Sequence, residues 1–178
     1  HEVLLTVCVG VAVYPDDGDK TEQLLSRASM ALSKARKRGR GECVFFAERM
    51  NAEAVDFLAL KEGLYAARQQ DQFEVHYQPY FCLQSQRIAG LEALARWHSA
   101  SLGWVQPSRF IPVLEDTGLI HDVGQLLVEQ VCEQLARWRS AGFVAPISFN
   151  LSPQQFGEEL IVVQLVDTVE RYGLTPQD

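Results

Sequence analysis

Residues Ile88–Trp97 read IAGLEALARW and decide how the rest of the chain is interpreted. Side chains of a β-strand alternate between its two faces, so Gly90, Glu92, Leu94 and Arg96 are expected to share one face. The other face then carries only apolar side chains. From this alternation alone, an ordinary amphipathic strand with a surface ion pair stays open as an interpretation.

The segments around this strand predict a hairpin followed by a loop. Residues Glu74–Leu83 have strand character, and only the short polar turn of residues 84–86 separates them from Ile88–Trp97. So short a connection favours an antiparallel pair. Pro107 and Pro112 then predict a loop, because proline interrupts regular backbone hydrogen bonding.

The last third of the chain alternates helix and strand. Asp122 and Gln125 predict a capping box at the start of a helix that ends at Gly142. Pro146–Leu151 is expected to be a strand. A second helix follows this strand, and Gly173 is expected to cap the helix. Strands that alternate with helices indicate parallel α/β packing.

The first fifty residues predict a separate β-α-β unit. Residues 3–14 are rich in β-branched side chains and predict a strand, and residues 42–47 predict another. Between them, residues 20–38 have helical spacing of apolar positions. Asp19 and Glu22 predict a capping box for that helix.

A polar helix over residues 51–72, with Asn51 as its N-cap, is expected to link two domains. The predicted organisation is therefore one domain part over residues 1–50, a linker helix over 51–72, and a second domain part over 73–178. The fold class is α/β.

Composition narrows the function classes and the compartment. A net charge of −7 and a pI near 5.1 argue against binding a nucleic-acid polymer, although a small anionic ligand needs only local positive charge. Cys8, Cys43, Cys82 and Cys132 are isolated among apolar residues, which predicts reduced core thiols and a cytoplasmic protein. The start without methionine, inside a predicted strand, indicates a piece of a longer parent protein, which an upstream segment could attach to a membrane.

Four blocks of sequence resemble the EAL domain family in their order along the chain. They are His76–Pro79 (HYQP), Leu91–Trp97 (LEALARW), Phe110–Ile120 (FIPVLEDTGLI) and Asn150–Ser152 (NLS). The resemblance implies a modified TIM barrel that hydrolyses cyclic di-GMP to the linear dinucleotide with Mg²⁺ or Mn²⁺. Glu115, in the third block, is interpreted as an organiser of a loop or helix start.

The resemblance also implies roles for single residues. Glu92 matches the first carboxylate metal ligand and Asn150 an amide ligand, and both donate hard oxygen atoms that suit such a cation. We expect a closed barrel to bring these two together. Gln78 and Leu94 match ligand-contacting positions, and Arg96 matches the arginine that contacts phosphate.

Lys34–Gly41 (KARKRGRG) resembles the last helix of a GGDEF domain. Arg36 and Arg40 fall on the family's triphosphate-contacting positions, which implies a remnant site for GTP. Three residues depart from the family pattern and put GTP turnover in doubt: Ser29, Gly41 and Arg36, which replaces the usual lysine. The residues alone also fit a solvated helix end whose cations complement the helix dipole.

Two functional hypotheses follow from these resemblances. From Gln72 onward 107 residues remain and a TIM barrel needs about 250, so an incomplete EAL barrel and an inactive fragment are expected. The parent is then a metal-dependent cyclic di-GMP phosphodiesterase, with a homodimer through the EAL domain as an option. The alternative is an inactive receptor that keeps Gln78, Leu94 and Arg96 for binding. A structural or dimerising role of the helix over 51–72 is a third, weaker hypothesis.

Overall fold

The computed structural model describes residues 3, 5–67, 70–156 and 161–175. The chain divides into two compact units, one up to Leu58 and one from Ala59 on, and each is described here by itself. The division falls inside helix α2 (Arg49–Ala67). A helix is therefore present where one was expected over residues 51–72, but it begins two residues before Asn51, so the predicted N-cap is wrong.

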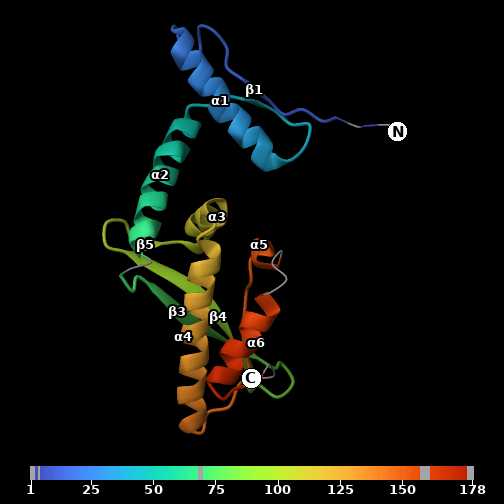
Figure 1. The fold of residues 1–178 in the computed structure, drawn as a ribbon, viewed down its shortest axis with the longest axis vertical. Helices are drawn as coiled ribbons and strands as arrows, with labels where there is room; N and C mark the ends of the chain where they lie inside the picture. The colour runs from blue at the N-terminus through green and yellow to red at the C-terminus, as the bar shows by residue number, and fades with distance from the viewer. Residues whose placement is uncertain (1–2, 4, 68–69, 157–160, 176–178) are drawn as a thin grey trace. The chain divides into compact units, whose positions relative to one another are not determined.

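The first unit is a parallel β-α-β unit, as predicted. Strand β1 (Val9–Val11) pairs in parallel with β2 (Cys43–Phe45), and helix α1 (Thr21–Arg38) connects them (Figure 1). The first strand is much shorter than residues 3–14. Only Val9–Val11 has a strand partner within the described residues, and Val7 before it is 70% exposed.

Helix α1 packs on the strands through its small residues. Ala31 and Ala35 are fully buried against Val44 and Phe46. Strand β1 approaches the helix so closely that a Cβ atom at Gly10 would lie 2.2 Å from the Ala28 carbonyl oxygen. The helix that the apolar spacing predicts over residues 20–38 is therefore present, with Ala31 and Ala35 in its buried face.

The predicted capping box of α1 is wrong. Lys20 occupies the N-cap position and makes no capping hydrogen bond through its side chain. Asp19 thus lies one residue too early to cap the helix. Glu22 still complements the positive end of the helix dipole in the first turn, and Gly39 ends the helix with a φ of 135°.

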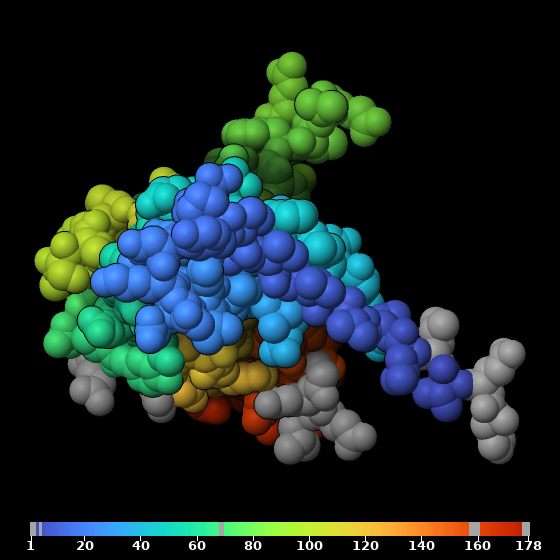
Figure 2. Space-filling view, turned by 90° about the horizontal axis from the view of Figure 1, so that it is seen from above, coloured from blue at the N-terminus to red at the C-terminus, as the bar shows by residue number. Residues whose placement is uncertain are grey.

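The second unit is built on the predicted hairpin. Strands β3 (Phe73–Phe81) and β4 (Ile88–Ser99) pair antiparallel, and the tip of the hairpin projects in green in Figure 2, where Leu83 is 93% exposed. The far end of β4 pairs antiparallel with β5 (Gly103–Val105). Its first half pairs in parallel with β6 (Ile147–Phe149), which confirms the predicted parallel packing.

Two segments that were predicted as loop are regular structure. Besides β5, residues Pro107–Thr117 form helix α3, which includes Pro112. Pro107 suits the first helical turn, where no N–H donor is needed. The helix tolerates Pro112 because Phe110 and Leu114 are buried on its inner side. Burial of that apolar stripe outweighs the hydrogen bond that Pro112 removes.

Helix α4 (Ile120–Ser140) covers one face of the sheet (Figure 1). Its predicted capping box is wrong, because the helix begins after Leu119 without a side-chain cap. Gln125 instead donates from Nε2 to Glu129 and to Thr168. The short helix α5 (Pro153–Phe156) and helix α6 (Ile161–Arg171) follow β6.

The cysteines are all free thiols, but only Cys132 is fully buried and Cys43 is exposed, so the prediction of four core cysteines is wrong. Short strands leave little room for buried side chains, and Cys43 points away from α1. Among the described residues, no helix is both long and apolar enough to cross a lipid bilayer.

Trp97 is the centre of the second unit's core. The side chain is 0% exposed, stacks on Phe73 and meets Phe110 of α3 edge-on, with ring centroids 6.1 and 5.9 Å apart. Its Nε1 donates to Gln72 Oε1. A Cβ atom at Gly63 of α2 would lie 3.1 Å from the indole, so the ring fills its space closely.

We expect Trp97→Ala to lower the free energy of unfolding by about 3–5 kcal/mol, because it empties a fully packed site. Denaturant unfolding of the 178-residue chain measures this loss. Trp104→Ala is the matched control, since Trp104 is 57% exposed and its removal should cost about 1 kcal/mol or less. Equal losses for the two variants would contradict this description of the core.

Tyr77 lies on the helix-facing side of β3, where its ring meets Trp138 of α4 at a centroid distance of 4.8 Å. Burial, with a smaller contribution from Cys132, raises the pKa of Tyr77 to about 12. Burial also raises the pKa of the Cys132 thiol. The folded chain therefore resists ionisation of both groups.

Stability should fall as pH rises above about 10, the ordinary tyrosine value, because the unfolded state releases the Tyr77 proton there and the folded state does not. The loss continues until the pH reaches the folded-state pKa near 12. Tyr77→Phe should flatten this part of the curve, measured as unfolding midpoint against pH. A curve as steep in the variant as in the wild type would show that other groups cause the loss.

Candidate functional site

Glu92 and Asn150 meet on the face of the sheet that α3 and α4 do not cover. Glu92 lies within β4, in register with Ser148 of β6, and Asn150 comes two residues after Ser148, directly after the end of β6 and on the same face. The Asn150 Nδ2 atom donates a hydrogen bond of 2.8 Å to Glu92 Oε1. The pairing of β4 with β6 is enough to bring together two residues that are 58 positions apart, so a closed barrel is not required.

Gln78 belongs to the same face. It is the cross-strand partner of Glu92 in the β3–β4 hairpin, and neighbouring partners of this kind have side chains about 5 Å apart at their Cβ atoms. Next to this pair, Tyr80 lies over Gly90, where a Cβ atom would come within 2.1 Å of the tyrosine oxygen. The glycine in IAGLEALARW therefore makes room for Tyr80 beside Glu92.

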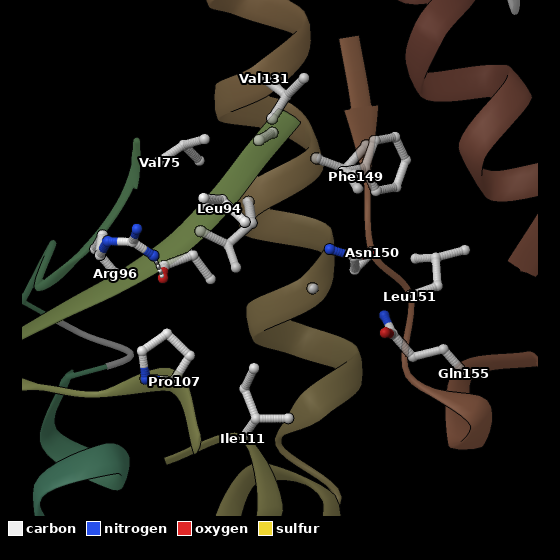
Figure 3. Close-up of a pocket in the computed structure, with 15 residues that line it drawn as sticks. Val75, Leu94, Arg96, Pro107, Ile111, Val131, Phe149, Asn150, Leu151 and Gln155 are labelled. Atoms are coloured by element: carbon white, nitrogen blue, oxygen red, sulfur yellow. Dashed lines mark hydrogen bonds between the residues drawn. The ribbon is translucent and has the colours of Figure 1, made fainter. Parts of the chain in front are cut away.

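Leu94 and Arg96 lie further along β4, on the same face by alternation. Here β4 has left β6 and has not yet met β5, and a cavity of about 210 Å³ opens between β4, the segment after β6, and α4 (Figure 3). Leu94, Arg96 and Asn150 line its edge, and most other lining side chains are apolar. The Arg96 Nη1 atom donates to the Ala95 carbonyl oxygen at 2.9 Å, which keeps the guanidinium close to the strand.

The segment that carries Asn150 is held by hydrogen bonds that the sequence interpretation missed. Ser152 caps α5: its Oγ accepts from the Gln154 N–H, and its own N–H donates to Gln155 Oε1. This is a reciprocal capping box of the type S-x-x-Q, with Pro153 at the first helical position. The pattern Ser-Pro-Gln-Gln was the signal for it. Glu115 of α3 accepts from the Ser152 hydroxyl at 2.6 Å.

The donor set at this site suits part of the coordination shell of a hard divalent cation. Two ligand atoms that share an octahedral cation at about 2.0–2.1 Å lie roughly 2.9 Å apart, close to the separation of the Glu92 and Asn150 side-chain atoms. Turning the Asn150 amide about its last bond would offer an oxygen in place of the nitrogen. Within the described residues, no group of three or more His, Cys, Asp or Glu side chains could hold a metal ion. These residues therefore fit such a cation but provide only two of its ligands.

The histidines near this face have other partners. His76 Nε2 is 2.9 Å from Glu74 Oε1, and its ring meets Trp104 at 5.9 Å. His98 packs against the same tryptophan, with centroids 4.9 Å apart. These contacts make an aromatic cluster beside Arg96 rather than a ligand set.

The structure places Arg36 and Arg40 in the first unit, at the end of α1. Arg36 is exposed in the last helical turn and lines a shallow hollow with Ser29 and Ser33. Arg40 is exposed beyond Gly39, outside the helix. Nothing in this geometry tests a phosphate-binding role for either side chain, so that role stays a prediction.

Curated proteins with similar sequences include signalling proteins. The bifunctional diguanylate cyclase/cyclic di-GMP phosphodiesterase MucR of Pseudomonas aeruginosa is 34% identical over 177 residues, which cover 99% of this chain and 26% of MucR. The chain thus spans about a quarter of the length of this relative, and similar or smaller shares of the others.

Solved structures with similar folds include a phosphodiesterase and an EAL enzyme. The PaMucR phosphodiesterase in its c-di-GMP complex superposes with a TM-score of 0.63 at 32% identity, over 66% of this chain and 48% of that one. The EAL enzyme Bd1971 in its cGMP-bound form gives a TM-score of 0.63 at 28% identity, over 91% of this chain and 42% of that one.

The family model of the EAL domain matches residues 61–178, which include every element of the sheet that carries Glu92 and Asn150. The match does not include residues 1–60, so the resemblance of that part to a GGDEF domain stays a prediction. Through residues 61–178, this chain belongs to the EAL domain family.

Proposed function

We propose that this chain is part of a bacterial signalling protein that hydrolyses cyclic di-GMP to the linear dinucleotide pGpG. The observation that carries the proposal is the contact of 2.8 Å between the Glu92 carboxylate and the Asn150 amide, on one face with Gln78. A pure binding site has no need of a carboxylate and an amide, two groups that can each offer a hard oxygen donor, side by side in this way. The family membership and the phosphodiesterases among the relatives support the same reaction.

Glu92 and Asn150 would hold Mg²⁺ or Mn²⁺. The bound ion would supply a water molecule activated for attack on phosphorus. The work of the two side chains is to fix the ion at the sheet face, and Glu92 also provides negative charge to balance it. Their hydrogen bond keeps the two side chains next to each other before any ion arrives, so binding requires only that the Asn150 amide turn to present its oxygen.

Gln78, Leu94 and Arg96 would hold the nucleotide. Gln78 offers an amide that donates and accepts beside Glu92, and Leu94 offers an apolar surface at the cavity edge. Arg96 offers a planar fork of donors that matches phosphate oxygens. All three lie in line with Glu92 along two paired strands, so a ligand lying across the sheet face would meet each of them.

Residues 1–50 would be the last part of a GGDEF domain, with Arg36 and Arg40 as the remnant of a site for GTP phosphates. The parallel β-α-β unit and the basic end of α1 support this assignment. We also propose that the parent protein works in the cytoplasm, with or without a membrane attachment, and that it pairs through its EAL domain.

The 178-residue chain alone should not hydrolyse cyclic di-GMP. Its described residues supply two ligands where a divalent cation takes about six. Incubation with Mn²⁺ and cyclic di-GMP, followed by chromatography for linear dinucleotide, checks this expectation. Metal-dependent product from the purified chain would show that two ligands suffice.

In the parent protein, Glu92→Gln should lower the rate of Mn²⁺-dependent hydrolysis at least about 100-fold, because it removes a charged ligand while keeping the side chain's shape. The matched control is Glu133→Gln, which changes a surface glutamate paired with Arg137 on α4 and should leave the rate unchanged. Chromatographic product assays measure both. A wild-type parent that binds cyclic di-GMP in calorimetry but forms no product would support the receptor hypothesis instead.

A further inference from the structure

Glu115 of α3 reaches the segment that carries Asn150 through a hydrogen bond to Ser152. Its Oε1 accepts the Ser152 hydroxyl at 2.6 Å, at the short end of the range for an O–H donor. Ser152 is buried, so water competes weakly for this bond. The contact joins two segments that are 37 residues apart.

The Ser152 end of this contact is rigid. Ser152 is locked into the capping box of α5, and its partner Gln155 is only 3% exposed. The Gln155 amide in turn lies against α4, where a Cβ atom at Gly124 would come within 2.3 Å of Gln155 Nε2. Because the Ser152 side chain is held in this way, the position of its backbone is fixed as well. Asn150 is only two residues away.

The Glu115 end is rigid as well. Helix α3 is seated on β4 through Phe110, which packs edge-on against the buried Trp97. Strand β4 also carries Glu92. The chain of contacts therefore closes on itself: from Glu92 to Asn150, through Ser152 and Glu115 to α3, and back to β4 through Phe110 and Trp97.

We propose that Glu115 is a positioning residue for the metal-binding pair: through Ser152 it sets where the Asn150 amide lies relative to the Glu92 carboxylate. The inference rests on the proposed function for the meaning of that pair, but the positioning itself is a property of the folded chain. Glu115 touches neither the ion nor the nucleotide in this scheme. Residues that hold a metal ligand in place in this way affect metal affinity by about 10- to 100-fold.

The positioning can be tested in the 178-residue chain without any activity. Nuclear magnetic resonance with ¹⁵N-labelled asparagine reports the side-chain amide of Asn150. We expect Glu115→Ala and Ser152→Ala each to shift this signal, and the double variant to shift it no further than the larger single shift, because both remove the same bond. Glu115→Gln keeps a weaker acceptor and should give a smaller shift in the same direction.

Glu133→Ala is the control, because it removes a carboxylate from α4 that pairs with Arg137 on the surface, and it should leave the Asn150 signal in place. An unchanged Asn150 signal in folded Glu115→Ala, or fully additive shifts in the double variant, would overturn the proposal. If Glu115→Ala does not fold, Glu115→Gln and Ser152→Ala decide, and unchanged Asn150 signals in both count against it.

Activity of the parent protein gives a second and separate measurement. In Glu115→Ala, the Mn²⁺ concentration for half-maximal hydrolysis should rise about tenfold, while the KM for cyclic di-GMP changes less than about twofold. A lower kcat with unchanged metal dependence would overturn the positioning role. If the wild-type parent hydrolyses nothing, the proposed function fails, whereas the resonance experiment still tests the positioning.

Discussion

The parallel pairing of β4 with β6 is the constraint on which the site depends. Three residue pairs form this ladder: Leu91 with Ile147, Glu92 with Ser148, and Ala93 with Phe149. Because side chains alternate along each strand, this register sends Leu91 and Ile147 toward the helices and puts Glu92 and Asn150 on the opposite face. A shift of one residue would reverse both faces at once and separate the pair.

The two faces of the sheet therefore have different roles. The helix-facing side is covered by α4 and α3, with Trp97 fully buried and the pKa of Tyr77 raised by its burial. That rigid layer supports polar side chains on the other side at fixed spacing. Where β4 has left β6 and has not yet reached β5, the sheet opens and Leu94 and Arg96 border a cavity. Strand β4 therefore contributes to the core, carries Glu92 of the donor pair and borders the cavity.

The predictions from sequence were least accurate at the starts of helices. Asp19 and Asp122 have the right residue type for capping, but α1 begins at the exposed Thr21, and α4 begins at Ile120, which is buried in the core. A cap contributes about 1 kcal/mol, less than the burial of a few large side chains. The capping box that does form, at Ser152, coincides with a helix start that a proline also favours.

The sequence by itself determined the hairpin, the β-α-β unit, the alternation in IAGLEALARW and the family of residues 61–178, because all of these are written in local spacing and in short blocks. Only the tertiary structure decided that Asn150 bonds to Glu92, that Glu115 holds Ser152, and that Pro112 lies inside a helix. The two hydrogen bonds join segments that are tens of residues apart. The helix that contains Pro112 depends on burial against other segments of the chain. Spacing along the chain carries no information about such contacts, because they follow from which strands pair and which helices cover them.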